Sequence, residues 1–329
     1  MSDTVLVGKG FLGGLNVAHT IAALMELHPG TGDRTPVDAD FGRAARLLAD
    51  RGIRVLVADP GAVRFTDVGA VCSGWVPASD RWEPSGPHPL CGVYNRLPAR
   101  RPERWHELLG ALQLHHIPVG NPPAFNRLAL DKCASLQALA AAGLPVPEVE
   151  TAPERFDARL REWGSGFLKP RFGSFGRGVV RVEAGQIPPV GDEGEGAVLL
   201  QRAVAPPTGP FEGLCVRGLV QRDPRGRWRG AGRVARVSAD DPVVNVARGA
   251  QGLPLDTVAE QLPVVHGLGA RLDDLEMAVV AALEAAAGDE AASLLEIGVD
   301  WVLDPAGDPW IIEINGKPDI EAFGIAEFN

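Results

Sequence analysis

Residues 294–318, near the end of the sequence, have the pattern of two β-strands joined by a tight turn. The turn lies at residues 304–308, Asp-Pro-Ala-Gly-Asp, where Asp precedes Pro and Gly follows closely. The flanking runs are apolar, β-branched and aromatic, as is typical of strands. Folding the hairpin about Ala306 places Asp300 opposite Glu313, and alternation along the strand puts Asn315 on the same face as Glu313. The sequence therefore predicts a hairpin with one acidic face.

Two interpretations of this acidic face remain open. Carboxylates that face each other across a sheet repel and destabilise it, and a bound cation would reverse that effect. The oxygen atoms of Asp, Glu and Asn, with no Cys or His nearby, suit a hard ion such as Mg²⁺, which usually also binds substrate phosphates. The other interpretation is a solvated hairpin face that is simply acidic.

The net charge of −10 argues against non-specific binding of nucleic acid. Within this acidic chain, residues 217–236 form a basic island with seven arginines: Arg217, Arg222, Arg225, Arg227, Arg229, Arg233 and Arg236. Either an anion-binding site or a solvated arginine face accounts for them. With 329 residues, of which 45% are hydrophobic and 22% charged, we expect a globular chain of two or three domains or lobes.

The cysteines and the hydropathy pattern favour a reduced, cytoplasmic protein that does not enter a membrane. Cys72, Cys91, Cys133 and Cys215 are scattered, without a spacing that suggests zinc. The chain starts directly with a strand-like segment at residues 4–7, and no apolar run approaches the length of about 20 residues that spans a bilayer.

The order of the predicted elements changes along the chain. Strands and helices alternate over residues 1–120, which favours a parallel sheet. A helix is expected from Asn126 to about Ala142, ended by Gly143 and Pro145. The later strands are expected at 166–169, 179–182, 197–204, 214–221 and 228–237, with helices at 152–163 and 264–287.

A glycine-rich loop follows the strand that ends near Lys169. Gly173, Gly176 and Gly178 would let backbone N–H groups approach phosphate oxygens, and Lys169 would add a point charge. No GK[ST] follows, so this is not a Walker A loop. A glycine-rich hairpin turn in a lid is the alternative. Lys132, inside the preceding helix, could supply a further charge or could be solvated surface.

A second glycine pattern at the start of the chain has a weaker basis. Gly8, Gly10 and Gly13 match GxGxxG after a strand, a pattern that can seat a dinucleotide at a helix N-terminus. However, the expected acidic residue about 20 positions further on is missing. We therefore favour a glycine-rich turn lining a substrate pocket. The histidines form no nucleophilic triad, and no GxSxG elbow is present.

Read in order, the motifs between residues 120 and 318 resemble those of the ATP-grasp superfamily of ATP-dependent ligases. The matching pieces are Asp131-Lys132, residues 142–147, Leu168-Lys169-Pro170, residues 173–178, residues 199–204, Arg217, Asn245, Arg248-Gly249, residues 298–300 and residues 313–315. The most similar branch is the endospore coat-associated, YheC/YheD-like one, through residues 93–96, 230–236 and 244–249. The resemblance implies an ATP-grasp fold: α/β, with α+β character in the catalytic part.

The resemblance also implies three domains. Residues 1–120 would form an N-terminal Rossmann-like pre-ATP-grasp domain. Residues 121–196 would contain the linker helix and the small lid subdomain, and residues 197–329 the C-terminal catalytic subdomain.

Site residues follow from the resemblance position by position. The phosphates of ATP would be bound by Lys132, Lys169 and the loop residues Gly173, Ser174, Phe175, Gly176 and Gly178. The hinge reading adenine would be Gln201, Arg202, Ala203 and Val204, with Glu212 at the ribose. Two Mg²⁺ ions would be bound by Asp300, Glu313 and Asn315. The candidate catalytic residues are Arg217, Arg236, Lys169 and Asn245.

Two positions depart from the family pattern. Arg202 stands where relatives often have an acidic residue, and Cys215 where an Asp usually precedes the arginine by two. These changes affect the expected nucleotide contacts and leave the metal and phosphate residues intact.

The expected activity is that of an ATP- and Mg²⁺-dependent carboxylate–amine ligase that forms an amide through an acyl phosphate and releases ADP and phosphate. Its substrates would be a small carboxylate and an amine, such as an amino acid or peptide, and the chain could form a homodimer. One alternative is a kinase acting on a hydroxyl, and another is a nucleotide-binding, coat-associated protein with little turnover. An oxidoreductase using Gly8, Gly10 and Gly13 is the remaining alternative.

Overall fold

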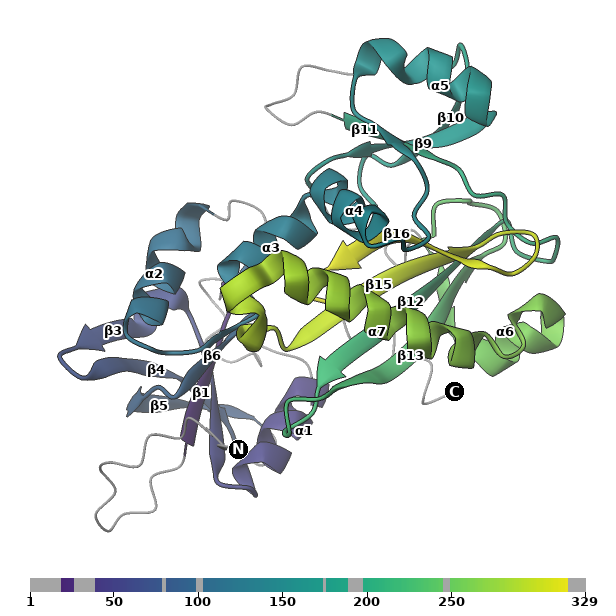
Figure 1. The fold of residues 1–329 in the computed structure, drawn as a ribbon. Coiled ribbons are helices and arrows are strands. Elements are labelled where there is room, and N and C mark those ends of the chain that lie inside the picture. The colour runs from purple at the N-terminus through teal and green to yellow at the C-terminus, as the bar shows by residue number, and fades with distance from the viewer. Residues whose placement is uncertain are drawn as a thin grey trace, which may run out of the picture. The chain divides into compact units, whose positions relative to one another are not determined.

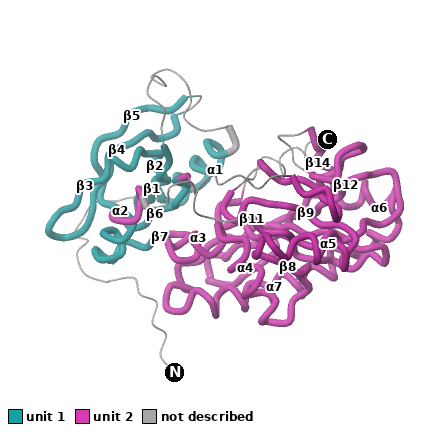
Figure 2. The backbone as a smooth tube through the Cα atoms, turned by 90° about the horizontal axis from the view of Figure 1, so that it is seen from above, with its two compact units in different colours: residues 1–97, 108–119 teal, residues 98–107, 120–329 magenta. Residues whose placement is uncertain are grey.

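A computed structural model describes residues 19–26, 39–78, 81–98, 103–173, 176–188, 198–244 and 249–318. Several predicted features lie outside these residues: the strand at 4–7, the glycine pattern at 8–14, Ser174, Phe175 and Asn245. The chain divides into two compact units, one of residues 1–97 and 108–119 and the other of residues 98–107 and 120–329 (Figure 2). No helix among the described residues is long and apolar enough to cross a membrane.

The first unit is built on a mixed sheet, seven-stranded within the described residues, with the order β3-β4-β2-β1-β6-β7 and β5 paired to β4. Its strands are β1 (His19–Leu24), β2 (Ile53–Ala58), β3 (Val63–Thr66), β4 (Gly69–Pro77), β5 (Trp82–Pro89), β6 (Gly92–Asn95) and β7 (Val119–Gly120). Its helices are α1 (Ala39–Ala49) and the part of α2 (Glu103–Leu114) from residue 108 onward, with the short 3₁₀ helix η1 (Pro60–Ala62).

The prediction of a parallel sheet for this part holds only at its centre. Strand β1 pairs in parallel with β2 and with β6, whereas β3, β4 and β5 form an antiparallel meander. The sequence analysis missed β5 because Pro84, Pro87 and Pro89 interrupt the strand pattern. Proline lacks an N–H donor and is tolerated on a strand that pairs on one side, as β5 does.

The helix predicted from residue 126 to 142 is in fact two helices, α3 (Pro123–Leu130) and α4 (Lys132–Ala141). They meet at Asp131, whose backbone is extended at φ −84° and ψ 95°. The Asp131 carboxylate accepts hydrogen bonds from the N–H groups of Cys133 and Ala134, both at 3.1 Å, and so caps α4. The single-helix prediction was wrong because it overlooked this cap.

The second unit contains a small antiparallel sheet of four described strands in the order β10-β9-β11-β8. Its strands are β8 (Val149–Glu150), β9 (Ser165–Pro170), β10 (Val180–Glu183) and β11 (Val198–Arg202). Helix α5 (Phe156–Trp163), which follows η2 (Pro153–Arg155), packs on this sheet through Phe156 and Leu160 against Leu168 and Leu200. The result is a small layer with its own apolar core, drawn in teal in Figure 1.

The larger sheet of this unit has the order β14-β13-β12-β15-β16, five strands within the described residues. Its strands are β12 (Gly213–Arg222), β13 (Trp228–Ser238), β14 (Gln251–Leu253), β15 (Glu296–Leu303) and β16 (Pro309–Asn315). The long helix α7 (Leu268–Ala287) runs alongside it (Figure 1), and α6 (Leu255–Gln261), η4 (Pro263–Val265) and η5 (Gly288–Ser293) complete the unit.

The two faces of this sheet differ in chemistry. Alternate strand residues, including Val216, Ala235, Val299, Trp301 and Ile314, join the main apolar core with α4 and α7. Their neighbours in sequence therefore point to the opposite face. That face carries Cys215, Arg217, Arg236, Asp300, Glu313 and Asn315.

Candidate functional site

The closing hairpin has the register that the sequence predicts. Asp300 lies opposite Glu313, and Gly298 lies opposite Asn315. In the turn, the N–H groups of Ala306 and Asp308 each donate to Asp304 Oδ1 at 2.9 Å. The prediction that two carboxylates and an amide share one face is confirmed.

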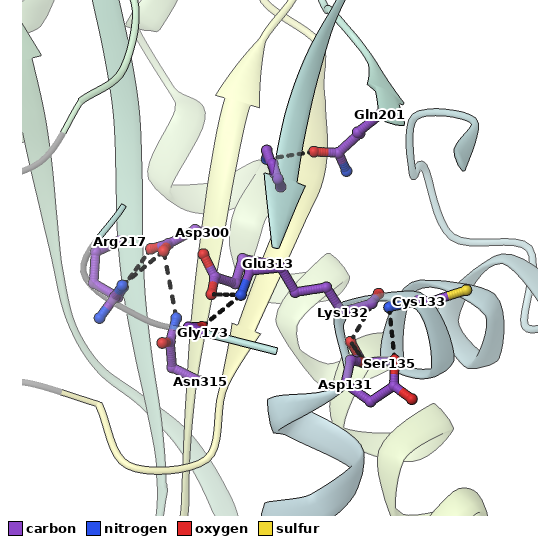
Figure 3. Close-up of polar contacts among 11 residues, drawn as sticks. Asp131, Lys132, Cys133, Ser135, Gly173, Gln201, Arg217, Asp300, Glu313 and Asn315 are labelled. Atoms are coloured by element: carbon purple, nitrogen blue, oxygen red, sulfur yellow. Dashed lines mark hydrogen bonds and ion pairs between the residues drawn. The ribbon is translucent and has the colours of Figure 1, made fainter. Parts of the chain in front are cut away.

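Strand β12 brings Arg217 opposite Asp300 on the same sheet. Arg217 donates from Nε to Asp300 Oδ1 and from Nη2 to Asp300 Oδ2, the second at 2.6 Å, and Asn315 Nδ2 donates to Oδ2 at 3.3 Å (Figure 3). Both members of the ion pair are 6% exposed. The sequence analysis selected both residues and did not predict that they pair.

Burial and pairing act in opposite directions on the pKa of Asp300. Burial alone would raise the pKa of this carboxyl, but the guanidinium of Arg217 outweighs burial and holds it below its ordinary value. Burial likewise disfavours the charged Arg217, yet the Asp300 carboxylate raises its pKa. The pairing thus favours the ionised form of both side chains.

Arg236 and Cys215 extend the polar face onto β13 and β12, where they lie opposite each other. Arg236 Nε is buried and has no hydrogen-bond partner. Burial raises the pKa of the Cys215 thiol to about 12, so the thiol is neutral where an acidic residue was expected from the family pattern.

The basic island is now explained mainly by ion pairs. Five of its seven arginines are ion-paired: Arg217 with Asp300, Arg222 with Glu284, Arg227 and Arg229 with Asp223, and Arg233 with Asp273 and Glu276. Most of the island is therefore neither an anion site nor a freely solvated face. Only Arg217 and Arg236 belong to the polar face with Asp300.

The two candidate phosphate lysines lie buried beside this face. Lys132 Nζ donates to the Gly173 carbonyl at 2.5 Å and lies 3.3 Å from Glu313 Oε1 (Figure 3). Lys169 Nζ, on β9, donates to Gln201 Oε1 at 2.5 Å. Burial lowers the pKa of Lys169 to about 8, although the Glu313 carboxylate opposes that change. The structure thus brings Lys132 and Lys169 together with Glu313.

The base of the glycine loop is fastened to the start of α4. Arg171 donates to both oxygens of Asp131, at 2.8 and 2.6 Å, and Lys132 N–H donates to the Arg171 carbonyl at 3.2 Å. Gly176 and Gly178 have φ of +61° and +71°, which favours glycine at both positions. The binding of phosphate by this loop stays a prediction. The Asp131–Arg171 contact was missed, and Asp before the helix start was the available signal for the cap.

The predicted hinge is largely occupied by protein partners. Arg202 N–H donates to the Glu148 carbonyl at 2.9 Å and Ala203 N–H to the Ser165 carbonyl at 3.1 Å. The Arg202 side chain pairs with Glu148 and lies over the ring of Trp310 at 5.5 Å. Gln201 is 1% exposed, and its Nε2 has no hydrogen-bond partner.

The other predicted nucleotide residues remain predictions. Glu212 is exposed immediately before β12, and Val204 follows the hinge residues described above. Adenine recognition at residues 201–204 and ribose binding by Glu212 are therefore not tested by these contacts.

The donor set fits a hard cation of the Mg²⁺ type. Asp300, Glu313 and Asn315 offer only oxygen ligands on one face of one hairpin. No three residues among His, Cys, Asp and Glu cluster as a metal site in the described parts of the chain. Two carboxylates and one amide leave most positions of an octahedral ion to water and phosphate, which is how Mg²⁺ is usually bound.

Asn121, which was not among the predicted site residues, holds the two strands together at the open end of the hairpin. Asn121, which is 2% exposed, donates from Nδ2 to the Glu296 carbonyl at 2.6 Å and to the Gly316 carbonyl at 2.7 Å. Its Oδ1 accepts from Leu295 N–H at 2.7 Å. Nothing local in the sequence marks this role, because the partners lie more than 170 residues away in the chain.

Comparison with solved structures defines the fold. The chain is similar to D-alanyl-alanine synthetase A from Vibrio cholerae, with a TM-score of 0.56, 14% identity, and coverage of 92% of this chain and 90% of that one. It is similar to an ATP-grasp RimK domain protein from Sphaerobacter thermophilus, with a TM-score of 0.54, 20% identity, and coverage of 93% and 94%. It is also similar to the ATP-grasp ligase PsnB in complex with a precursor peptide and AMPPNP. The TM-score is 0.53, the identity is 18%, and the match covers 97% of this chain and 95% of that one. The chain therefore has the ATP-grasp fold.

Comparison with models of protein families adds a match within the ATP-grasp group. Residues 192–327, which include β12, β13, β15 and β16, match the YheC/D-like ATP-grasp family. The chain thus has the ATP-grasp fold, and its residues 192–327 are similar to the YheC/D-like branch, in agreement with the resemblance of the sequence motifs. None of the curated proteins compared with the chain is similar to it in sequence.

Proposed function

We propose that the protein is an ATP- and Mg²⁺-dependent ligase that joins a small carboxylate to an amine through an acyl phosphate. The observation that carries the proposal is the single polar face where Asp300, Glu313 and Asn315 meet buried cations. In support, PsnB has been solved with Mg and ADP, and other proteins of the same fold are named as synthetases and ligases of amino acids.

In this proposal each charged group has a place. Asp300, Glu313 and Asn315 would hold Mg²⁺, which would offset the negative charge of the phosphate oxygens. Lys132, from α4, and Lys169, from β9 of the small sheet, would bind the same phosphates. Arg217, Arg236 and Asn245 would contact the group in transfer, and the loop from Gly173 to Gly178 would cover it.

The chemistry requires no nucleophilic side chain. A carboxylate oxygen of the first substrate attacks the γ-phosphorus of ATP, and the bond from that phosphorus to ADP breaks. The amine then attacks the acyl carbon, loses a proton and expels phosphate. Fixed cations in a site shielded from water stabilise the charge that develops at each step. The absence of a Ser-His-Asp arrangement in the sequence agrees with this route.

We also propose that three segments of the chain have different roles. Residues 1–120 would bind substrate, residues 121–196 would form the linker helix and the lid, and residues 197–329 would supply the metal and phosphate ligands. The amine and the carboxylate would be amino acids or short peptides, since relatives of this fold include a D-Ala:D-Ser ligase and a ligase bound to a precursor peptide.

The test is ADP release from Mg-ATP across a panel of amino acids, peptides and small carboxylates. We expect release that needs a carboxylate and an amine together, and hydroxylamine should trap the activated carboxylate as a hydroxamate. Glu313→Ala should lower kcat at least about a hundredfold, because Glu313 is a proposed metal ligand, whereas Glu260→Ala, at an exposed position of α6, should not. ADP release that requires only a hydroxyl compound would support a kinase and contradict the ligase.

A further inference from the structure

The carboxylates on the polar face of the large sheet are paired with cationic side chains of the same protein. Both oxygens of Asp300 accept from Arg217, and Oδ2 also accepts from Asn315. Glu313 lies 3.3 Å from Lys132. Each carboxylate proposed to bind metal thus already has a protein cation as its partner.

Burial makes these pairings hard to undo one at a time. Arg217 and Asp300 are each 6% exposed, and they sit opposite each other on neighbouring strands whose backbones are fixed by the sheet. Removing one partner of a buried ion pair leaves an uncompensated charge, which is strongly unfavourable. A ligand that separates Arg217 from Asp300 must therefore compensate both of them.

Resting on the proposed function, we infer that Arg217 takes the place of the metal ion at Asp300, so that metal and nucleotide bind as one coupled unit. A metal ion alone would compensate Asp300 and leave Arg217 buried beside another cation. A nucleotide without metal would offer phosphate to Arg217 and leave Asp300 facing that phosphate. Metal and phosphate together compensate both residues, and Arg217 moves from the carboxylate to the phosphate.

Arg236 does not share this role. Its Nε has no hydrogen-bond partner, and Arg236 acts on Asp300 through its charge and not through a hydrogen bond, so this Nε can bind a phosphate without the loss of an existing bond. Arg217 is therefore the residue that couples the two ligands. By linkage, the metal must raise the affinity for nucleotide by the same factor by which nucleotide raises the affinity for metal.

The inference is tested by measuring each ligand alone and both together on the full chain. Binding of Mn²⁺ without nucleotide is followed by electron paramagnetic resonance, and binding of AMPPNP by calorimetry, in EDTA and in excess Mg²⁺. For the unmodified protein we expect AMPPNP to bind at least about tenfold more tightly with Mg²⁺ than in EDTA, within the usual range of coupling between sites. Equal affinity in the two conditions would overturn the inference.

Two substitutions test the role of Arg217 from opposite sides. Arg217→Met should raise the affinity for Mn²⁺ alone by about tenfold, because it frees both Asp300 oxygens. Arg222→Met is the matched control, since Arg222 lies on the same strand and pairs with Glu284 on α7 instead. An affinity for Mn²⁺ that is unchanged in Arg217→Met contradicts the inference.

Asp300→Asn keeps the experiment decisive if Arg217→Met does not fold. It removes the charge that holds Arg217, so metal-free AMPPNP should bind about tenfold more tightly than to the unmodified protein. A purely structural role of the pair would weaken binding instead, and that result would overturn the inference.

The outcomes separate this inference from the proposed function. Coupled binding without ligation by any substrate pair would refute the ligase and support the coupling. Ligation with uncoupled binding would refute only the coupling. If the protein binds no AMPPNP in excess Mg²⁺, both are wrong.

Discussion

Burial disfavours the positive charge of Lys169, whereas the proposed binding of phosphate requires that charge. The residue is 7% exposed, its ammonium group donates to Gln201, and burial lowers its pKa from the ordinary 10.5 to about 8. The unfolded chain then binds more protons than the folded chain between about pH 8 and 10.5. With respect to this group, stability rises with pH over that window. The charge that would bind phosphate is lost over the same range.

We therefore expect kcat/KM for ATP to fall as the pH rises through about 8, since this ratio reports the ionisation of the free enzyme. Lys169→Arg should flatten the alkaline limb, because a guanidinium stays charged throughout. Initial rates between pH 6.5 and 9.5 would check this. An unchanged alkaline limb in Lys169→Arg would assign the ionisation to another group.

At the scale of elements, the hairpin of β15 and β16 is held at its open end by Asn121. The side-chain amide bonds to backbone groups of Leu295, Glu296 and Gly316, and Gly316 directly follows the proposed ligand Asn315. Gly316 itself packs closely against α3, where an added Cβ would lie 2.8 Å from Asn126 Oδ1. The positions of the proposed metal ligands thus depend on contacts from α3 and from Asn121, which lies two residues before that helix.

Asn121→Ala should lower the free energy of unfolding by about 2–4 kcal/mol, because buried backbone groups lose their partners. It should also raise the Mg²⁺ concentration needed for half-maximal activity several-fold, as the end of β16 loosens. Denaturant unfolding and Mg²⁺ titration of ADP release measure the two effects. Gln261→Ala, at an exposed amide, should show neither. A loss of stability with an unchanged Mg²⁺ requirement would make Asn121 structural only.

The hairpin also shows how far the sequence could predict this site. Its turn and register are local, so Asp300 and Glu313 could be placed opposite each other from alternation alone. The pairing of Arg217 with Asp300 joins strands 83 residues apart, and a strand pattern does not say which strand lies beside it. For the same reason the contacts of Asn121 were missed. The motifs selected the candidate residues, and only the fold shows which of them neutralise one another.

At the scale of the whole molecule, the protein consists of two compact units with separate apolar cores. One core includes Val55, Val57 and Trp82 of the first unit, and the other includes Val216, Val279 and Trp301 of the second. All the described residues of the candidate site belong to the second unit. Ligand binding should therefore stabilise one unit directly.

Calorimetry should detect this difference between the units. At a hundredfold excess over its dissociation constant, Mg-AMPPNP should stabilise the second unit by about 2.7 kcal/mol. For a unit of this size, that free energy corresponds to a rise in Tm of about 5–10 °C. The transition of the first unit should shift less, and Glu313→Ala should abolish the shift, because the metal and phosphate charges would no longer be compensated. A shift of equal size in both transitions would show that the units unfold together, and a shift retained in Glu313→Ala would place the nucleotide elsewhere.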